Sequence, residues 1–144
     1  MTAVRRNAAM TAFWRLHSAL FRLTGGRFLA TTNGFPILLL VTRGRKSGAP
    51  KSVALQSLAE GDGYAVIGSY AGEDRHPAWW LNLRAEPEAE VRIRGRSRRV
   101  RAREAVGDER ERIWSRFVAI DPAYEVYRRQ TARRIPVVVL EPIA

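Results

Sequence analysis

The stretch FPILLLVTRGRKSGAPKSVAL, from Phe35 to Leu55, decides the fold of this protein. Its apolar first part ends at Val41, far short of the roughly 20 residues that a membrane-spanning helix needs, so it predicts a buried strand. Residues 51–58 alternate in the way that a second strand does. Between the two lies a bend, 42–51, with two glycines and four basic side chains. The sequence therefore predicts a β-hairpin with a cationic bend.

Further strand signals follow this hairpin. Turn residues at 60–63 precede a strand at 64–69. Two strands within 89–105 are joined by a tight turn at 95–97, and a β-branched run at 135–140 gives the last strand. Six strands with short connections predict a mainly β fold with peripheral helices (α+β), in the form of a closed or half-closed antiparallel barrel.

Helical patterns lie at the N-terminus and in the second half of the chain. Residues 1–26 carry apolar side chains at helical spacing, which predicts an amphipathic helix ahead of a barrel domain at 27–144. This helix would either pack on the domain or lie on a membrane surface. Asp108 with Glu111 resembles a capping box. The other predicted helices span 77–83, 108–120 and 124–132.

The composition limits the classes of partner and site. The 144 residues include 25 Lys and Arg against 14 Asp and Glu, a net charge of +11, so the surface attracts anions such as phosphates, nucleic acid or acidic lipid. The absence of cysteine excludes disulfides and thiolate metal sites. Arginines interrupt the N-terminal apolar stretch, unlike in a secretory signal. We therefore expect a cytoplasmic protein, at the inner face of the membrane if the N-terminal helix binds lipid.

None of the common catalytic motifs is present. The chain has two histidines, His17 and His76, and no histidine–carboxylate cluster, so no metal site is predicted. It also lacks a GxSxG nucleophile motif and a glycine fingerprint after a strand. An enzyme with this sequence would take its chemistry from a cofactor. The bend offers either a phosphate site, with Arg45 and Lys46 as donors, or an ordinary solvated turn.

Six short motifs, in this order and spacing, resemble the deazaflavin (coenzyme F-420)-dependent nitroreductase family. They are GRKSGxPK at 44–51, DGY at 62–64, GS at 68–69, HPAWWLNL at 76–83, PAYxxY at 122–127 and IPVVVLEP at 135–142. The resemblance implies a split β-barrel similar to the flavin mononucleotide (FMN)-binding split barrels. It implies reduced coenzyme F-420, a deazaflavin with a phosphate and a polyglutamate tail, as the cofactor, with FMN as the runner-up.

The resemblance also implies roles for individual residues. The phosphate and acidic tail would be held by Arg45, Lys46, Ser47 and Lys51. The deazaflavin ring and its linker would be bordered by Ala54, Gln56, Ile67, Gly68, Ser69, Tyr70, Ala78, Trp79 and Asn82. Ser69 would donate a hydrogen bond or proton near the reacting centre, and Tyr124 and Tyr127 would line the acceptor pocket. Relatives often have a tyrosine where this chain has Asp121, which favours an acceptor other than a nitroimidazole.

These implications predict an oxidoreductase that transfers a hydride from reduced F-420 to an electron-poor acceptor, such as an enone, a quinone or a nitro compound. The resemblance also suggests a homodimer. Two alternatives remain: a basic β-barrel that binds nucleic acid, and an F-420 binder without turnover. The arginines at 92–103 alternate as an ordinary solvent face does, which counts against nucleic acid. Trp79, at helical spacing from Leu83, fits a core position as well as a ligand contact.

Overall fold

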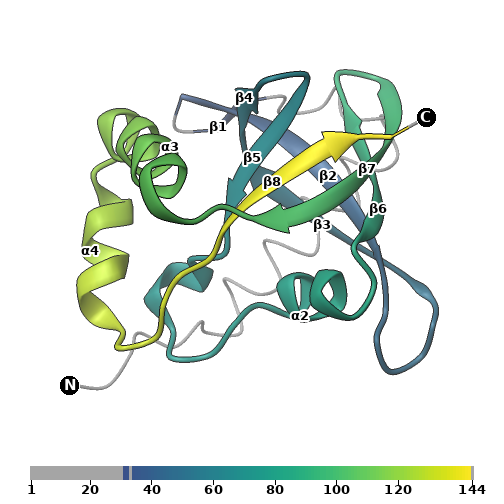
Figure 1. Ribbon diagram of the computed structural model, residues 1–144, viewed down its shortest axis with the longest axis horizontal. Coiled ribbons are helices and arrows are strands. Elements are labelled where there is room, and N and C mark those ends of the chain that lie inside the picture. The colour runs from purple at the N-terminus through teal and green to yellow at the C-terminus, as the bar shows by residue number, and fades with distance from the viewer. Residues whose placement is uncertain (1–30, 33, 144) are drawn as a thin grey trace.

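The structure is a computed structural model that describes residues 31–32 and 34–143. The predicted N-terminal helix at 1–26 lies outside the described residues, as does its predicted contact with a membrane. Within the described part, no helix is long and apolar enough to cross a bilayer. Strands form the centre of the molecule, with helices at its periphery (Figure 1).

All strand pairs are antiparallel, and they form one curved sheet. The strands run in the spatial order β1-β2-β6-β7-β8-β5-β4, and β3 pairs with β2 beside this path. Their bounds are β1 Thr31–Thr32, β2 Phe35–Arg43, β3 Pro50–Gln56, β4 Leu58–Glu60, β5 Gly63–Ile67, β6 Glu88–Ile93, β7 Arg96–Glu104 and β8 Val137–Pro142. Among the described strands, β1, β3 and β4 each have a single strand neighbour. The barrel is therefore open at these three strands.

The helices cover the barrel from two sides. α3 (Gly107–Ile120) and α4 (Ala123–Gln130) lie together on one side, while α2 (Ala78–Ala85) lies at another side of the sheet, near β2 and β3 (Figure 1). A one-turn helix, η1 (Tyr70–Gly72), contacts α4. This arrangement confirms the predicted mainly β fold with peripheral helices.

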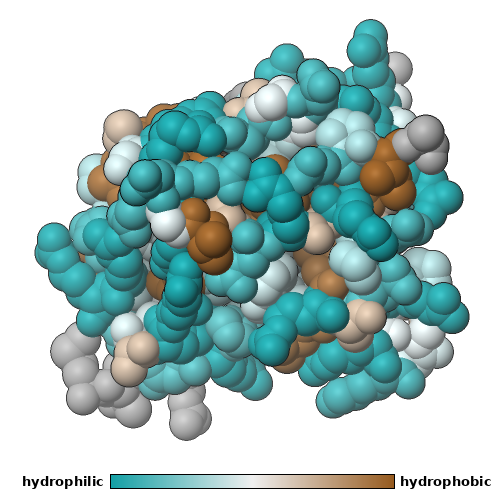
Figure 2. All heavy atoms as spheres, in the orientation of Figure 1, coloured by the Kyte–Doolittle hydropathy of each residue, from teal (hydrophilic) through white to brown (hydrophobic). Residues whose placement is uncertain are grey.

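Each group of helices packs on its own part of the core. α3 buries Ile113, Trp114 and Phe117 at the spacing of one helix face. Phe117 stacks on Phe35 with ring centroids 5.1 Å apart, and Tyr124 of α4 meets both rings edge-on. A second cluster lies under α2 and includes Trp79, Trp80 and Leu83. The face of the molecule that Figure 2 shows is mostly hydrophilic, with small separate apolar patches.

The sequence-based predictions are wrong in three details. The short strand β1 is not among the six predicted strands. The second strand does not run through 51–58, because Ser57 interrupts it: its N–H and its hydroxyl both donate to Pro36 O, at 2.9 and 3.0 Å. The chain turns there, so β3 pairs with β2 whereas β4 pairs with β5. The capping box is also absent, since no side chain caps α3. Asp108 instead lies in the first turn, where a carboxylate favours the helix dipole.

Candidate functional site

A cavity of about 750 Å³ lies along β3. Its walls come from the β2–β3 bend, from β3, from the loop after β5, from α2 and from the start of α4. The cavity brings together every residue that the resemblance assigned to a site, except Gly68. It is also lined by Asp121, and by Thr42, Ser52 and Ala71, which sequence reasoning did not identify.

The bend between β2 and β3 has a closed backbone and exposed basic side chains. Gly44 N–H donates to Ala49 O at 2.8 Å, and Gly48 N–H donates to Gly44 O at 2.7 Å. Gly48 has a φ of +73°, a conformation that glycine adopts without strain. The side chains of Arg45, Lys46 and Lys51 are exposed at one end of the cavity. Positive charge is therefore concentrated at this end of the cavity, on a backbone that hydrogen bonds hold in place.

Asn82 ties this bend to α2. Its Oδ1 accepts from the backbone N–H of Arg45 at 3.1 Å and from Nη1 of the same residue at 3.2 Å. Its Nδ2 donates to Thr42 Oγ1 at 3.1 Å, and the amide is only 4% exposed. The resemblance placed Asn82 on the wall of the site. The structure adds that its side-chain oxygen holds the backbone and the guanidinium of Arg45 in the bend.

The strand β3 forms the long wall. Six successive residues, from Lys51 to Gln56, border the cavity. A strand shows such an unbroken run when its edge, as well as one face, borders an opening, and β3 has only one strand neighbour among the described residues. Ala54 on β3 and Ala78 on α2 have small side chains on two different walls. Trp79 is 7% exposed, so it both borders the cavity and packs in the core.

Arg133 holds the loop that forms the opposite wall. Its guanidinium donates to three backbone carbonyls, Gly68 O at 3.1 Å, Ser69 O at 2.8 Å and Glu73 O at 2.8 Å. Between them, Tyr70 and Ala71 have φ values of 47° and 53°, a left-handed conformation that costs energy in residues other than glycine. We infer that these bonds keep the loop in its conformation. No sequence signal distinguished Arg133 from the other arginines of this chain.

Gly68 is the one predicted site residue outside the cavity lining. Its N–H donates to Pro136 O at 2.9 Å, where β8 begins. A Cβ at this position would lie 2.7 Å from Pro136 Cγ, a contact that real Cβ atoms do not make. Its place in the motif is thus explained by the close approach of two chain segments.

The far end of the cavity is aromatic. Tyr124 is 5% exposed, and its hydroxyl donates to Gln56 Oε1 at 2.6 Å. Burial, with smaller contributions from Tyr127 and Asp121, raises the pKa of Tyr124. Burial followed by Asp121 likewise raises the pKa of Tyr127. Both phenols therefore keep their protons at neutral pH and act as neutral donors.

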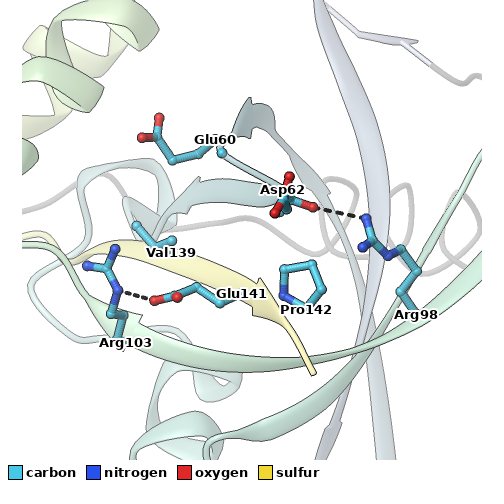
Figure 3. A pocket seen from close by; sticks show the side chains of 9 residues that line it. Glu60, Asp62, Arg98, Arg103, Val139, Glu141 and Pro142 are labelled. Atoms are coloured by element: carbon cyan, nitrogen blue, oxygen red, sulfur yellow. Dashed lines mark hydrogen bonds and ion pairs between the residues drawn. The ribbon is translucent and has the colours of Figure 1, made fainter. Parts of the chain in front are cut away.

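A second hollow, of about 430 Å³, lies between the β4–β5 turn and strands β7 and β8 (Figure 3). Its two arginines already have partners: Arg103 pairs with Glu141, and Arg98 donates to Asp62 O at 3.0 Å. Among the described residues there is no group of His, Asp and Glu side chains that could hold a metal ion. The described lining of this hollow therefore leaves no arginine unpaired for an anionic ligand, and the cavity along β3 is the candidate site.

His76 makes the Arg133 contact sensitive to pH. Arg133 Nη1 lies 3.2 Å from His76 Nδ1, which can accept this bond only while the ring is neutral. Burial, with Arg133 and Arg84, lowers the pKa of His76 below its ordinary value of 6.5. The unfolded chain therefore binds a proton more readily than the folded one, and stability decreases as the pH falls below the ordinary value.

We expect the melting temperature to fall between about pH 7.5 and about pH 5.5, and the decrease to be smaller in His76→Gln. Glutamine keeps an acceptor for Arg133 but does not titrate. Calorimetric scans of the unchanged protein and of His76→Gln at three pH values in this range test this prediction. Parallel curves for the two proteins would show that His76 does not contribute. Carboxylates also affect the melting temperature, but only at lower pH. An example is Glu60, whose pKa is lowered mainly by its hydrogen bond with Arg112.

Comparisons with known proteins give a family for this sequence. The sequence profile of a family described as F420H(2)-dependent quinone reductase matches residues 13–142. An F420H(2)-dependent quinone reductase of Mycobacterium tuberculosis (strain ATCC 25618 / H37Rv) is 36% identical over 131 residues, covering 88% of this chain and 87% of that protein.

Solved structures show the same fold. An F420-H2 dependent reductase, FDR-A, superposes with a TM-score of 0.67 at 37% identity and covers 74% of this chain and 94% of its own. A protein described as a domain-swapped dimer has a TM-score of 0.68 at 34% identity and covers 91% of this chain and 98% of its own. Together with the sheet topology, these structures confirm the predicted split β-barrel.

Proposed function

The chain belongs to the F420H(2)-dependent quinone reductase family, and we propose that the cavity along β3 is where it binds reduced coenzyme F-420 and its acceptor. The protein is an oxidoreductase that transfers a hydride from reduced F-420 to a quinone-type acceptor, and F-420 rather than FMN is its cofactor. Enones and nitro compounds stay predicted alternatives. The assignment of individual residues below is part of the proposal.

The charge of the bend supports its role as the anchor for the coenzyme phosphate and acidic tail. Arg45, Lys46 and Lys51 present their charges at one end of the cavity, and Ser47 adds a hydroxyl. Phosphate and carboxylate oxygens are the acceptors with which such donors form their strongest hydrogen bonds. The ring would extend from there between β3 and α2, over Ala54 and Ala78, with Asn82 holding the bend in position.

When bound, the reduced coenzyme supplies the hydride. Gln56 would orient the acceptor: its Oε1 accepts from Tyr124, which leaves the N–H groups of its amide to donate to a quinone carbonyl. The quinone also needs a proton, which either comes directly from solvent or is donated by the hydroxyl of Ser69, which would then regain a proton from solvent. Ser69 borders the cavity, and Arg133 fixes its backbone carbonyl. The neutral hydroxyls of Tyr124 and Tyr127 line the acceptor end.

The observation that carries this proposal is one continuous cavity with a cationic anchor at one end and neutral aromatic donors at the other. The proposal is tested by mixing the protein anaerobically with reduced F-420 and a naphthoquinone and following the oxidation of F-420 by absorbance. We expect one coenzyme oxidised per quinone reduced, and tight binding of F-420 but not of FMN. Binding of F-420 without turnover would favour the non-catalytic alternative. Tighter binding of FMN would contradict the proposal.

Nucleic acid is disfavoured as the partner. The tryptophans within the described residues, Trp79, Trp80 and Trp114, are at most 7% exposed, so they form no platform on which bases could stack. A single-stranded oligonucleotide in the same titration provides the check, and binding of the oligonucleotide with no binding of F-420 would reverse the assignment.

A homodimer is also part of the proposal. Its support is the relative described as a domain-swapped dimer, which this chain matches over 91% of its length. Light scattering of the purified protein measures the mass directly. The cytoplasmic location, with or without contact at the inner face of the membrane, stays a prediction.

A further inference from the structure

The cavity has opposite charges at its two ends. Lys51 and Gln56 are five positions apart on β3, which places the cationic bend about 17 Å from the Gln56–Tyr124 hydrogen bond. Asp121 lies at the Tyr124 end and is the one acid among the described residues that line the cavity. The two ends therefore favour groups of opposite charge.

Asp121 is held in place by the chain around it. Its backbone N–H donates to Phe117 O at 2.9 Å, where α3 ends, and its Oδ1 accepts from Ala123 N–H at 3.0 Å, where α4 begins. The carboxylate is partly buried, so its charge is less screened than that of an exposed acid. The neighbouring phenols respond to this charge: after burial, Asp121 contributes to the raised pKa values of Tyr124 and Tyr127.

We propose that Asp121 determines which acceptors the enzyme takes: it favours uncharged or cationic quinones and rejects anionic ones. This inference rests on the proposed function of the cavity. With the coenzyme tail neutralising Arg45, Lys46 and Lys51, the Asp121 carboxylate is the one remaining charge among the described side chains that line the cavity. A sulfonate or carboxylate on the acceptor would be repelled there, whereas a quaternary ammonium group would be attracted.

The change Asp121→Asn tests this, because asparagine keeps an oxygen for the Ala123 N–H bond and removes only the charge. The probes are three naphthoquinones that carry a methyl, a sulfonate or a trimethylammonium-methyl substituent. Their dissociation constants are measured by protein fluorescence with oxidised F-420 saturating the cationic bend, and also without it. Asp108→Asn is the matched control, since Asp108 is an exposed acid in the first turn of α3 and does not line the cavity.

We expect Asp121→Asn to tighten binding of the sulfonate about 10-fold and to weaken binding of the ammonium probe by a similar factor, the size of one charge interaction in a partly buried site. Binding of the methyl probe should stay within about twofold. Asp108→Asn should change none of the three. Equal effects on all three probes, or no effect on the charged ones, would overturn the inference.

Turnover with reduced F-420 separates this inference from the proposed function. If the methyl probe binds but is not reduced, the function fails while the charge dependence of binding still decides the role of Asp121. If all three probes are reduced with the same kcat/KM by both proteins, the function stands and the role of Asp121 is rejected.

Discussion

Neutralising the bend with Arg45→Gln, Lys46→Gln and Lys51→Gln together is expected to weaken binding of reduced F-420 by about 100-fold or more. Each charge-assisted hydrogen bond to a phosphate or carboxylate contributes about 1–3 kcal/mol, and exposure to solvent brings each one toward the lower figure. Fluorescence titration at two salt concentrations measures the effect. The affinity of the unchanged protein should fall as salt rises, whereas that of the triple variant should depend on salt much less.

A charge-matched control separates local contacts from the overall charge of +11. Arg94, Arg96 and Arg101 lie on the β6–β7 hairpin, are exposed and do not line the cavity. Replacing these three by Gln removes the same net charge, and affinity for F-420 should stay within about threefold because none of them lines the cavity, so that only screened attraction is lost. Similar losses in both triple variants would indicate general electrostatic attraction and would remove the anchoring role of the bend.

Arg133→Ala is expected to lower the free energy of unfolding by about 2–4 kcal/mol, since it removes three hydrogen bonds from a charged donor to the carbonyls of a partly buried loop. It should also weaken coenzyme binding, because the conformation of Tyr70 and Ala71 would lose its support. Denaturant unfolding and F-420 titration measure the two effects. Arg133→Lys should recover only part of the loss, as an ammonium group cannot reproduce the planar arrangement of donors.

Arg134→Ala is the control for Arg133. Its side chain is 57% exposed and lies 3.7 Å from Glu104, an ion pair of the kind that contributes little. We expect a change within about 0.5 kcal/mol and unchanged coenzyme affinity. Equal effects of the two substitutions would show that the loop does not depend on Arg133.

The local patterns of this sequence predicted most of the strands and the helices of the second half. The turn at 95–97 and the alternation on both sides of it correspond to the β6–β7 hairpin. Short-range rules succeed there because strand pairing follows directly from a tight turn. They failed at Ser57, where pairing with Pro36 across 21 positions, rather than any local preference, ends the strand. They also failed at Asp108 and Glu111, where the spacing of a capping box was present without its hydrogen bonds.

Some residues of the candidate site could be assigned from the sequence, and others could not. The bend residues and the tyrosines stand in recognisable motifs, so the resemblance to a family is enough to assign them. Arg133 carries no such signal, since its partners Gly68, Ser69 and Glu73 are about 60 positions away in the chain. The Asp121 substitution was visible in the sequence, but its position at the end of the cavity opposite the cations was not.

By itself, the sequence determined the mainly β architecture, the cationic bend and the family to which the chain is similar, because these depend on residue type and on spacing over a few positions. Only the tertiary structure decided that Asn82 orients the bend, that Arg133 supports the opposite wall and that the two ends of the cavity differ in charge. These features are contacts between segments distant in the chain, and their geometry is set by how the sheet closes and where the helices pack.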